Sequence, residues 1–108
     1  MHKFRNVPTT VGAESYRSKR EAARHQELLL LQRAGEIAGL TREVPFVLAP
    51  ATKIGSERAI PPLRYLADFV YCAFGKIVVE DCKGFRTPVY RIKRHLMKTV
   101  HDVEVLET

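Results

Sequence analysis

The spacing of apolar residues along the chain predicts two helices and four strands. Apolar positions recur with helical spacing at Val89, Ile92, Leu96 and Val100, whereas they alternate with polar positions in the strand segments. The predicted elements are, in chain order, a helix at 18–34, a strand at 41–49, a hairpin at 64–71 and 76–83, a helix at 88–100 and a strand at 102–107. This α-β-β-β-α-β order predicts an α/β (α+β) fold with a central mixed sheet flanked by helices.

Residues that commonly cap helices stand at the ends of both predicted helices. Ser18 can cap the first helix, and Glu21 follows at the third helical position, as in a capping box. Gly35 suits the position just beyond its C-terminus. Thr87 and Pro88 are typical of an N-cap and a first helical residue, so the second helix is expected to begin there.

Two further segments complete the predicted organisation. Residues 1–16 include Lys3 and Arg5 and have little periodic apolar content, which predicts a basic, poorly ordered arm before a single domain at 17–108. Residues 50–62 contain no predicted element. A loop of this length is near the limit for a compact domain, so it is expected to be mobile or functional.

The central hairpin brings charged residues together. If its loop consists of Phe74 and Gly75 alone, Asp68 lies opposite Asp81, and Lys83 shares their face of the sheet. Like charges directly opposite each other destabilise a sheet. A divalent cation such as Mg²⁺, which takes oxygen ligands, would relieve that cost.

Other interpretations of the hairpin remain open. A three-residue loop would place Asp68 opposite Glu80 instead of Asp81, which still pairs two acids. In the two-residue register, Glu80 faces the other side, in a salt bridge or near solvent. The hairpin charges would also be explained by a solvated surface. His25, one turn after Glu21, is expected to be an ordinary helix residue.

Net charge narrows the class of binding partner, and the cysteine content indicates the cellular compartment. The 108 residues carry a formal net charge of +6, which favours an anionic partner, with nucleic acid ahead of an anionic membrane surface. No apolar run approaches the ~20 residues of a membrane-spanning helix. Cys72 and Cys82 lack metal-ligand spacing, so we expect free thiols in a reducing cytoplasm and no zinc.

The order of elements and charged residues resembles the PD-(D/E)xK nuclease superfamily. Asp68 matches the first acid of the motif, although Ala67 stands in place of the proline. The segment Asp81-Cys82-Lys83 matches the (D/E)xK element, and Glu21 matches the acid that many members carry on the leading helix. The motif is short, so its specificity comes from the order and context of these residues.

The whole chain is also similar to a family of small, poorly characterised phage and prophage proteins. The similarity lies in 18–22, 67–69 and 78–88, and it extends over residues 3–106. The loop at 50–63 has no counterpart in the nuclease pattern.

These resemblances imply a metal-dependent DNA endonuclease of phage origin, working in the cytoplasm of a bacterial host. Asp68, Asp81, Glu21 and the Cys82 carbonyl would bind Mg²⁺ or Mn²⁺. Lys83 would orient or deprotonate water, or offset negative charge in the transition state. Glu21 is equally well explained by its capping position.

The nuclease interpretation also predicts how DNA is bound. The side chains expected to contact phosphates are Lys19, Arg20, Arg86, Arg91, Lys93 and Arg94. Without a separate recognition domain, the protein is expected to recognise DNA shape, such as a Holliday junction or other branched DNA, as a homodimer with two sites. The alternatives are a non-catalytic DNA-binding protein on the same fold and a phage inhibitor module that binds a protein.

Overall fold

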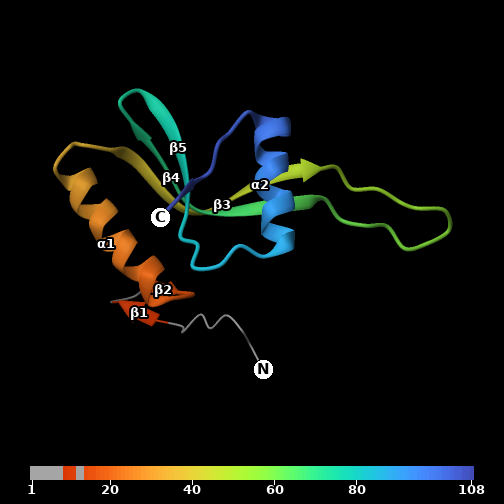
Figure 1. Cartoon of the computed structure of the whole chain (residues 1–108), viewed down its shortest axis with the longest axis horizontal. Helices are drawn as coiled ribbons and strands as arrows, with labels where there is room; N and C mark the ends of the chain where they lie inside the picture. Colours follow the sequence, from red (N-terminus) through yellow and green to blue (C-terminus); the bar gives the residue numbers. More distant parts are fainter. Residues whose placement is uncertain (1–8, 12–13) are drawn as a thin grey trace.

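A computed structural model describes residues 9–11 and 14–108 and contains two helices and six strands within them (Figure 1). In chain order the elements are β1 (Thr9–Val11), β2 (Glu14–Tyr16), α1 (Lys19–Arg33), β3 (Ala38–Ala49), β4 (Leu63–Ala73), β5 (Lys76–Asp81), α2 (Pro88–His101) and β6 (Leu106–Glu107). The two predicted helices and the predicted hairpin are present with nearly the expected bounds. The last strand is shorter than predicted: Asp102 ends α2 in a left-handed conformation, the N–H of Val103 still donates a hydrogen bond to the Met97 carbonyl, and β6 begins only at Leu106.

The main sheet is mixed and has the strand order β3-β4-β5-β6. The first three strands run antiparallel, and β6 pairs with β5 in parallel after the crossover through α2. Figure 1 shows α1 and α2 on either side of β5, and both helices begin on the same side of the molecule. The prediction of an α+β fold with a mixed central sheet is therefore confirmed.

The turn between β4 and β5 settles the hairpin register. Phe74 and Gly75 both have positive φ angles, 52° and 73°, as a two-residue type I′ turn requires. Phe69 pairs with Glu80, and Ala73 pairs with Lys76. The two-residue loop is therefore confirmed, and the three-residue alternative is excluded.

Part of the predicted N-terminal arm is folded. β1 and β2 form a short antiparallel hairpin in which Thr9 pairs with Tyr16. The Tyr16 side chain is buried against α1, where its hydroxyl shares a 2.5 Å hydrogen bond with Nδ1 of His25. Residues 1–8, which include the predicted basic positions Lys3 and Arg5, lie outside the described residues.

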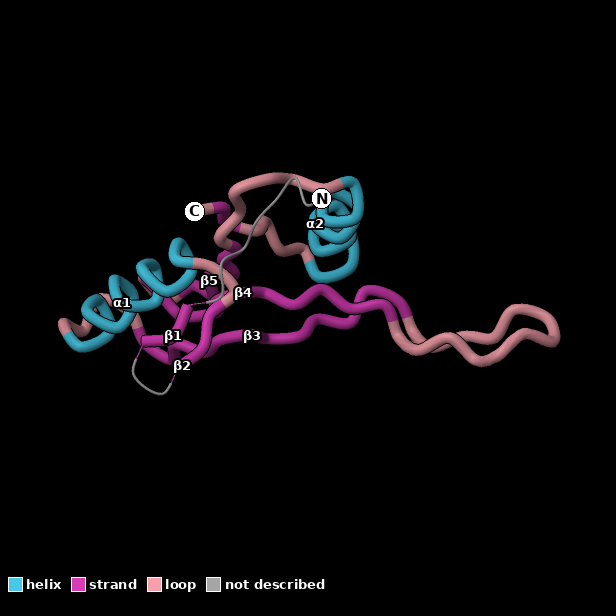
Figure 2. The backbone as a smooth tube through the Cα atoms, turned by 90° about the horizontal axis from the view of Figure 1, so that it is seen from below, coloured by secondary structure: helices cyan, strands magenta, loops and turns pink. Residues whose placement is uncertain are grey.

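The predicted loop at 50–62 extends a long two-stranded ribbon. β3 and β4 pair along most of their length, and a further bridge joins Thr52 to Ile60 beyond them. Figure 2 shows this ribbon projecting away from both helices. Its tip from 51 to 61 is exposed throughout, so it contributes nothing to the core.

The core has two parts, each lying under one helix. Beside α1 it is formed by Leu28, Ile37, Phe69 and Tyr71. Beside α2 it is formed by Leu48, Tyr65, Ala67, Val79, Tyr90, Met97 and Val105. No helix among the described residues is long and apolar enough to cross a membrane.

The predicted apolar stripe of α2 is buried only in part, since Leu96 packs against the core and the other three residues are exposed. Val89, Ile92 and Val100 are 61%, 59% and 50% exposed, whereas Tyr90 and Met97 are buried. Tyr90 and Met97 are seven residues apart and therefore lie on one side of the helix, about 100° from the row that begins at Val89. The larger side chains face the sheet, and the periodicity of the smaller ones was misleading.

Candidate functional site

Two buried aspartates lie next to each other where β4 and β5 run together. Continuing the register by one residue beyond the Phe69–Glu80 pair places Asp68 opposite Asp81. Their residues are only 3% and 2% exposed. Oδ2 of Asp68 accepts a 2.8 Å hydrogen bond from the backbone N–H of Cys82. The hairpin therefore fixes two carboxyl groups side by side in a water-poor environment.

Burial and proximity strongly affect the ionisation of Asp68. The pKa of Asp68 is raised to about 8, first by burial and then by a hydrogen bond with Asp81 and the negative charge of Asp81. The Cys82 N–H and the charge of Arg17 act in the opposite direction. The two carboxyl groups are therefore costly to ionise together unless a cation joins them.

Lys83 brings one positive charge to this pair. Its Nζ lies 3.4 Å from Oδ2 of Asp81 and 4.4 Å from the centre of the Tyr90 ring. The ring face of Tyr90 favours a cation at this position and holds the ammonium against the carboxylate. The Asp-x-Lys spacing thus places an acid and an amine on the same side of the strand end.

Glu21 points into the same region from the first turn of α1. Its N–H donates a 3.1 Å hydrogen bond to Oγ of Ser18, so the predicted N-cap is present. Its Oε1 accepts a 2.9 Å hydrogen bond from the backbone N–H of Arg17, whereas a standard capping box would use the N–H of Ser18. Capping leaves the other carboxylate oxygen, Oε2, available.

Arg17 joins the helix acid to the strand acid, and sequence analysis missed it. Its Nη2 atom forms an ion pair with Oδ1 of Asp68 and lies 3.8 Å from Oε2 of Glu21. A cation one residue before an N-cap, with an acid in the first turn, was the available signal. Its long-range partner, Asp68, is not evident from the sequence.

Several buried polar atoms around this cluster lack a hydrogen-bonding partner. Within the described part of the chain these atoms are Glu21 Oε2, Asp81 Oδ2, Tyr65 OH and Arg42 Nε. Glu21 and Asp81 belong to the cluster itself. Tyr65 lies close to it, because the negative charge of Asp81 adds to the effect of burial in raising the pKa of Tyr65. The described residues nevertheless contain no ready-made group of three or more His, Cys, Asp or Glu ligands.

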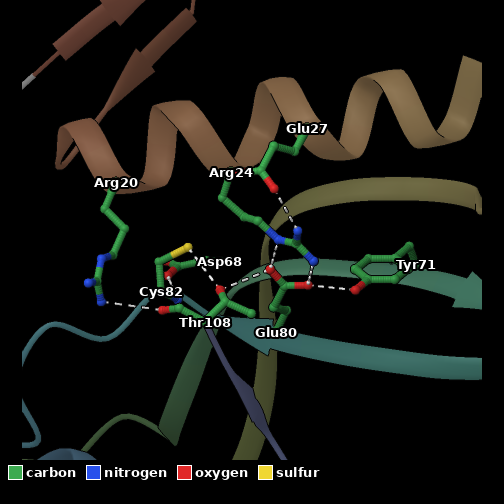
Figure 3. Close-up of polar contacts among 8 residues, drawn as sticks. All are labelled: Arg20, Arg24, Glu27, Asp68, Tyr71, Glu80, Cys82 and Thr108. Carbon is green, nitrogen blue, oxygen red and sulfur yellow. Dashed lines mark hydrogen bonds and ion pairs between the residues drawn. The ribbon is translucent and has the colours of Figure 1, made fainter.

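Glu80, which alternates in direction with Asp81 along β5, lies in a hydrogen-bonded network beneath α1 that Thr108 and Cys82 link to Asp68 (Figure 3). It is completely buried and accepts hydrogen bonds from Arg24 Nε at 2.5 Å, Tyr71 OH at 2.5 Å and Thr108 Oγ1 at 3.0 Å. The expected salt bridge is therefore present, with Arg24 as its partner. Because its oxygens are occupied, Glu80 is a poorer metal ligand than Asp81.

His25 and Cys82 have structural contacts near the cluster. His25 is buried between Tyr16 and Phe69, and burial lowers its pKa. Both cysteines are free thiols, as expected. Burial raises the pKa of the Cys82 thiol to about 11, and its Sγ lies 3.4 Å from Oγ1 of Thr108.

The predicted DNA-binding residues fall into two groups. At the edge of the cluster, Lys19 and Arg20 are exposed, and Arg20 donates a 3.1 Å hydrogen bond to the Lys83 carbonyl. On α2, Arg91 and Arg94 line an open groove together with His95, Lys98, Val103, Glu104 and Val105. Arg86 is ion-paired with Glu107, and Lys93 does not line this groove.

The fold and the site define an α+β domain with a buried carboxylate cluster and a partly basic surface. The chain belongs to the family described as "Protein of unknown function (DUF1064)", which matches residues 1–106. No curated protein and no solved structure gives a significant match to the chain.

Proposed function

We propose that this protein is a metal-dependent DNA endonuclease of the PD-(D/E)xK type, of phage origin. The observation that carries the proposal is the pair of adjoining buried aspartates, Asp68 and Asp81, with Lys83 3.4 Å from the second. The α1-β3-β4-β5-α2-β6 order supports a restriction-endonuclease-like arrangement of these residues. Glu21 on α1 adds the helix-borne acid of that pattern.

Two buried oxygens of the cluster that lack hydrogen bonds fit a divalent cation. Glu21 Oε2 and Asp81 Oδ2 each lie near one cation, Arg17 Nη2 at 3.8 Å and Lys83 Nζ at 3.4 Å, but neither accepts a hydrogen bond, so a metal ion or water could still bind them. Asp68, Asp81, Glu21 and the Cys82 carbonyl would hold Mg²⁺ or Mn²⁺, which prefer oxygen ligands. Such an ion supplies a water of lowered pKa and neutralises charge on a phosphate.

The protein's own groups would divide the remaining chemistry. Lys83 is held by Asp81 and Tyr90 and would orient the attacking water or stabilise negative charge on the phosphate. The Cys82 N–H and the ladder between β4 and β5 fix the orientation of Asp68. This rigidity favours catalysis, because a preorganised site need not rearrange when charge develops.

Basic side chains on two sides of the cluster would bind the DNA backbone. Lys19 and Arg20 lie beside the cluster, and Arg91 and Arg94 line the groove of α2. Arg86 and Lys93 complete the set. Phosphate contacts of this kind give affinity without base specificity, so we propose recognition of duplex or branched DNA by shape.

Cleavage of two strands requires two sites, which supports a homodimer acting in the host cytoplasm. The exposed apolar side chains of α2, Val89, Ile92 and Val100, are a suitable surface for a second copy.

A cleavage screen tests the proposal. Linear duplex, single-stranded, flapped and four-way DNA are incubated with the protein and Mg²⁺ or Mn²⁺. Wild type is expected to cut at least one of them, and Asp68→Ala is expected to cut none. Metal-independent binding without cutting would favour a non-catalytic DNA-binding protein, an alternative that the pairing of Arg17 with Asp68 supports. Absence of salt-sensitive DNA binding would favour the protein-binding inhibitor instead.

A further inference from the structure

Arg17 occupies the position between acids from two different elements. Its Nη2 atom contacts Asp68 on β4 and lies 3.8 Å from Glu21 on α1. The two acidic side chains are 4% and 3% exposed, whereas the Arg17 side chain is 53% exposed. The guanidinium thus reaches a buried anionic site from the solvent side.

The backbone at Arg17 is held in place by its neighbours, whereas its half-exposed side chain can move from the acids into solvent. Tyr16 is buried, bonded to His25 and covered by the Arg42 guanidinium 4.2 Å from its ring centre. Ser18 caps α1 on the other side. A half-exposed arginine side chain between two fixed residues can rotate into solvent without disturbing the fold.

The net charge of the acidic cluster indicates which ligand would displace Arg17. When all three acids, Glu21, Asp68 and Asp81, are ionised, as metal binding would require, the two cations Arg17 and Lys83 leave one negative charge unmatched. A divalent ion bound by the same oxygens would remove the attraction for Arg17 and repel it. The departing guanidinium would then lie at the solvent side of the site, where a DNA phosphate would approach.

We propose that Arg17 competes with the divalent cation for Asp68 and Glu21 and binds a DNA phosphate once it is displaced. This inference rests on the metal site proposed above. It assigns Arg17 opposite effects in the two binding steps. Removing its charge strengthens metal binding and weakens DNA binding by the metal-loaded protein. A merely structural arginine would not produce this pair of opposite changes.

The test measures both affinities in three proteins. Mn²⁺ affinity is determined by calorimetric titration of wild type, Arg17→Gln and the charge-matched control Arg33→Gln, whose exposed side chain lies at the far end of α1. Arg17→Gln is expected to bind Mn²⁺ about tenfold more tightly than wild type and the control. DNA affinity is then measured with Mn²⁺ in a Lys83→Ala background, where Arg17→Gln is expected to bind several-fold more weakly.

The outcomes separate this inference from the proposed metal site. Equal Mn²⁺ affinity in wild type and Arg17→Gln overturns the competition but leaves the metal site intact. No Mn²⁺ binding by any variant overturns both. If Arg17→Gln does not fold, Mg²⁺ is titrated into wild type and the Nε–H resonance of Arg17 is followed by NMR. It should shift with Mg²⁺ saturation, and an unchanged resonance at saturation overturns the competition.

Discussion

At the residue scale, the pairing of Asp68 with Asp81 makes the stability of the protein depend on pH. A carboxyl group whose pKa is raised on folding favours the folded state when it is protonated. Its contribution is fully present below its unfolded pKa of about 4 and is lost as the pH rises through the folded pKa of about 8. The metal-free protein should therefore lose stability across this range.

Replacing Asp68 by asparagine should remove this loss. Asp68→Asn is expected to have a higher free energy of unfolding than the metal-free wild type at pH 8, by about 1–3 kcal/mol, and a smaller advantage at pH 4. Chemical denaturation at both pH values provides the measurement. Asp102→Asn is the control, because Asp102 is exposed and its ion pair with Lys98 lowers its pKa. An advantage of Asp68→Asn that does not grow with pH would contradict the account.

Replacing Lys83 should separate DNA binding from the chemical step of cleavage. Lys83→Ala is expected to leave DNA affinity nearly unchanged, while cleavage falls by roughly 10²–10³-fold, as is typical for loss of one electrostatic stabiliser. Single-turnover cleavage and equilibrium binding on the same DNA provide the two readouts. Cleavage at the wild-type rate would mean that the Asp-x-Lys match is coincidental.

The sequence predicted the strand half of the site as one of two hairpin registers, and the turn geometry at Phe74 and Gly75 decided between them. Side chains alternate along strands, so the register of one hairpin determined the positions of Asp68, Asp81 and Lys83. Arg17 could not be predicted in this way. Its partner Asp68 is 51 residues away, and their contact depends on how α1 packs against the sheet.

At the scale of elements, α1 is held to the sheet by a buried ion pair as well as by apolar contacts. Arg24 on α1 binds both oxygens of Glu80, which is completely buried. Removing one partner of such a pair leaves an uncompensated charge in the interior. The acid on the other face of β5 thus has a structural role.

Arg24→Ala should therefore be strongly destabilising. A loss of about 3–5 kcal/mol in the free energy of unfolding is expected, because Glu80 would be buried without its cation. Arg20→Ala is the comparison, since Arg20 is exposed and donates to backbone carbonyls. It is expected to cost less than about 1 kcal/mol. Similar losses in the two variants would argue against a structural role for the Arg24–Glu80 pair.

The groove of α2 should contribute to DNA affinity through charge alone. Arg91→Ala combined with Arg94→Ala is expected to weaken binding to all sequences alike and to reduce the slope of log affinity against log salt by about two. Binding measured over a range of salt concentrations tests this. Lys76→Ala, at the tip of the β4–β5 hairpin, should leave the slope nearly unchanged. A sequence-dependent loss would contradict a backbone-binding role.

Helices and strands were predicted correctly where local sequence signals were strong. The prediction failed where tertiary packing determined which side chains are buried. The caps at Ser18 and Thr87 marked both helix starts, because their side chains satisfy local N–H groups. The predicted buried face of α2 was largely wrong, because Tyr90 and Met97 fill the space above the sheet. The β1–β2 hairpin was missed, as three-residue strands carry little periodic signal.

At the scale of the whole molecule, the site lies where three separate parts of the chain meet. The β2–α1 junction supplies Arg17 and Glu21, the β4–β5 hairpin supplies the two aspartates, and the segment after β5 supplies Lys83. The β3–β4 ribbon projects away from both helices (Figure 2). The net charge of +6 then favours approach of a polyanion to the exposed side of the cluster.

The most direct test of the central claim is a crystal structure of the protein grown with Mn²⁺, with the ion located by its anomalous signal. One peak is expected between the carboxylates of Asp68 and Asp81, with Glu21 nearby and the Arg17 guanidinium moved away from Asp68. No peak at saturating Mn²⁺, with Arg17 still bound to Asp68, would contradict the claim, as would a peak remote from this pair.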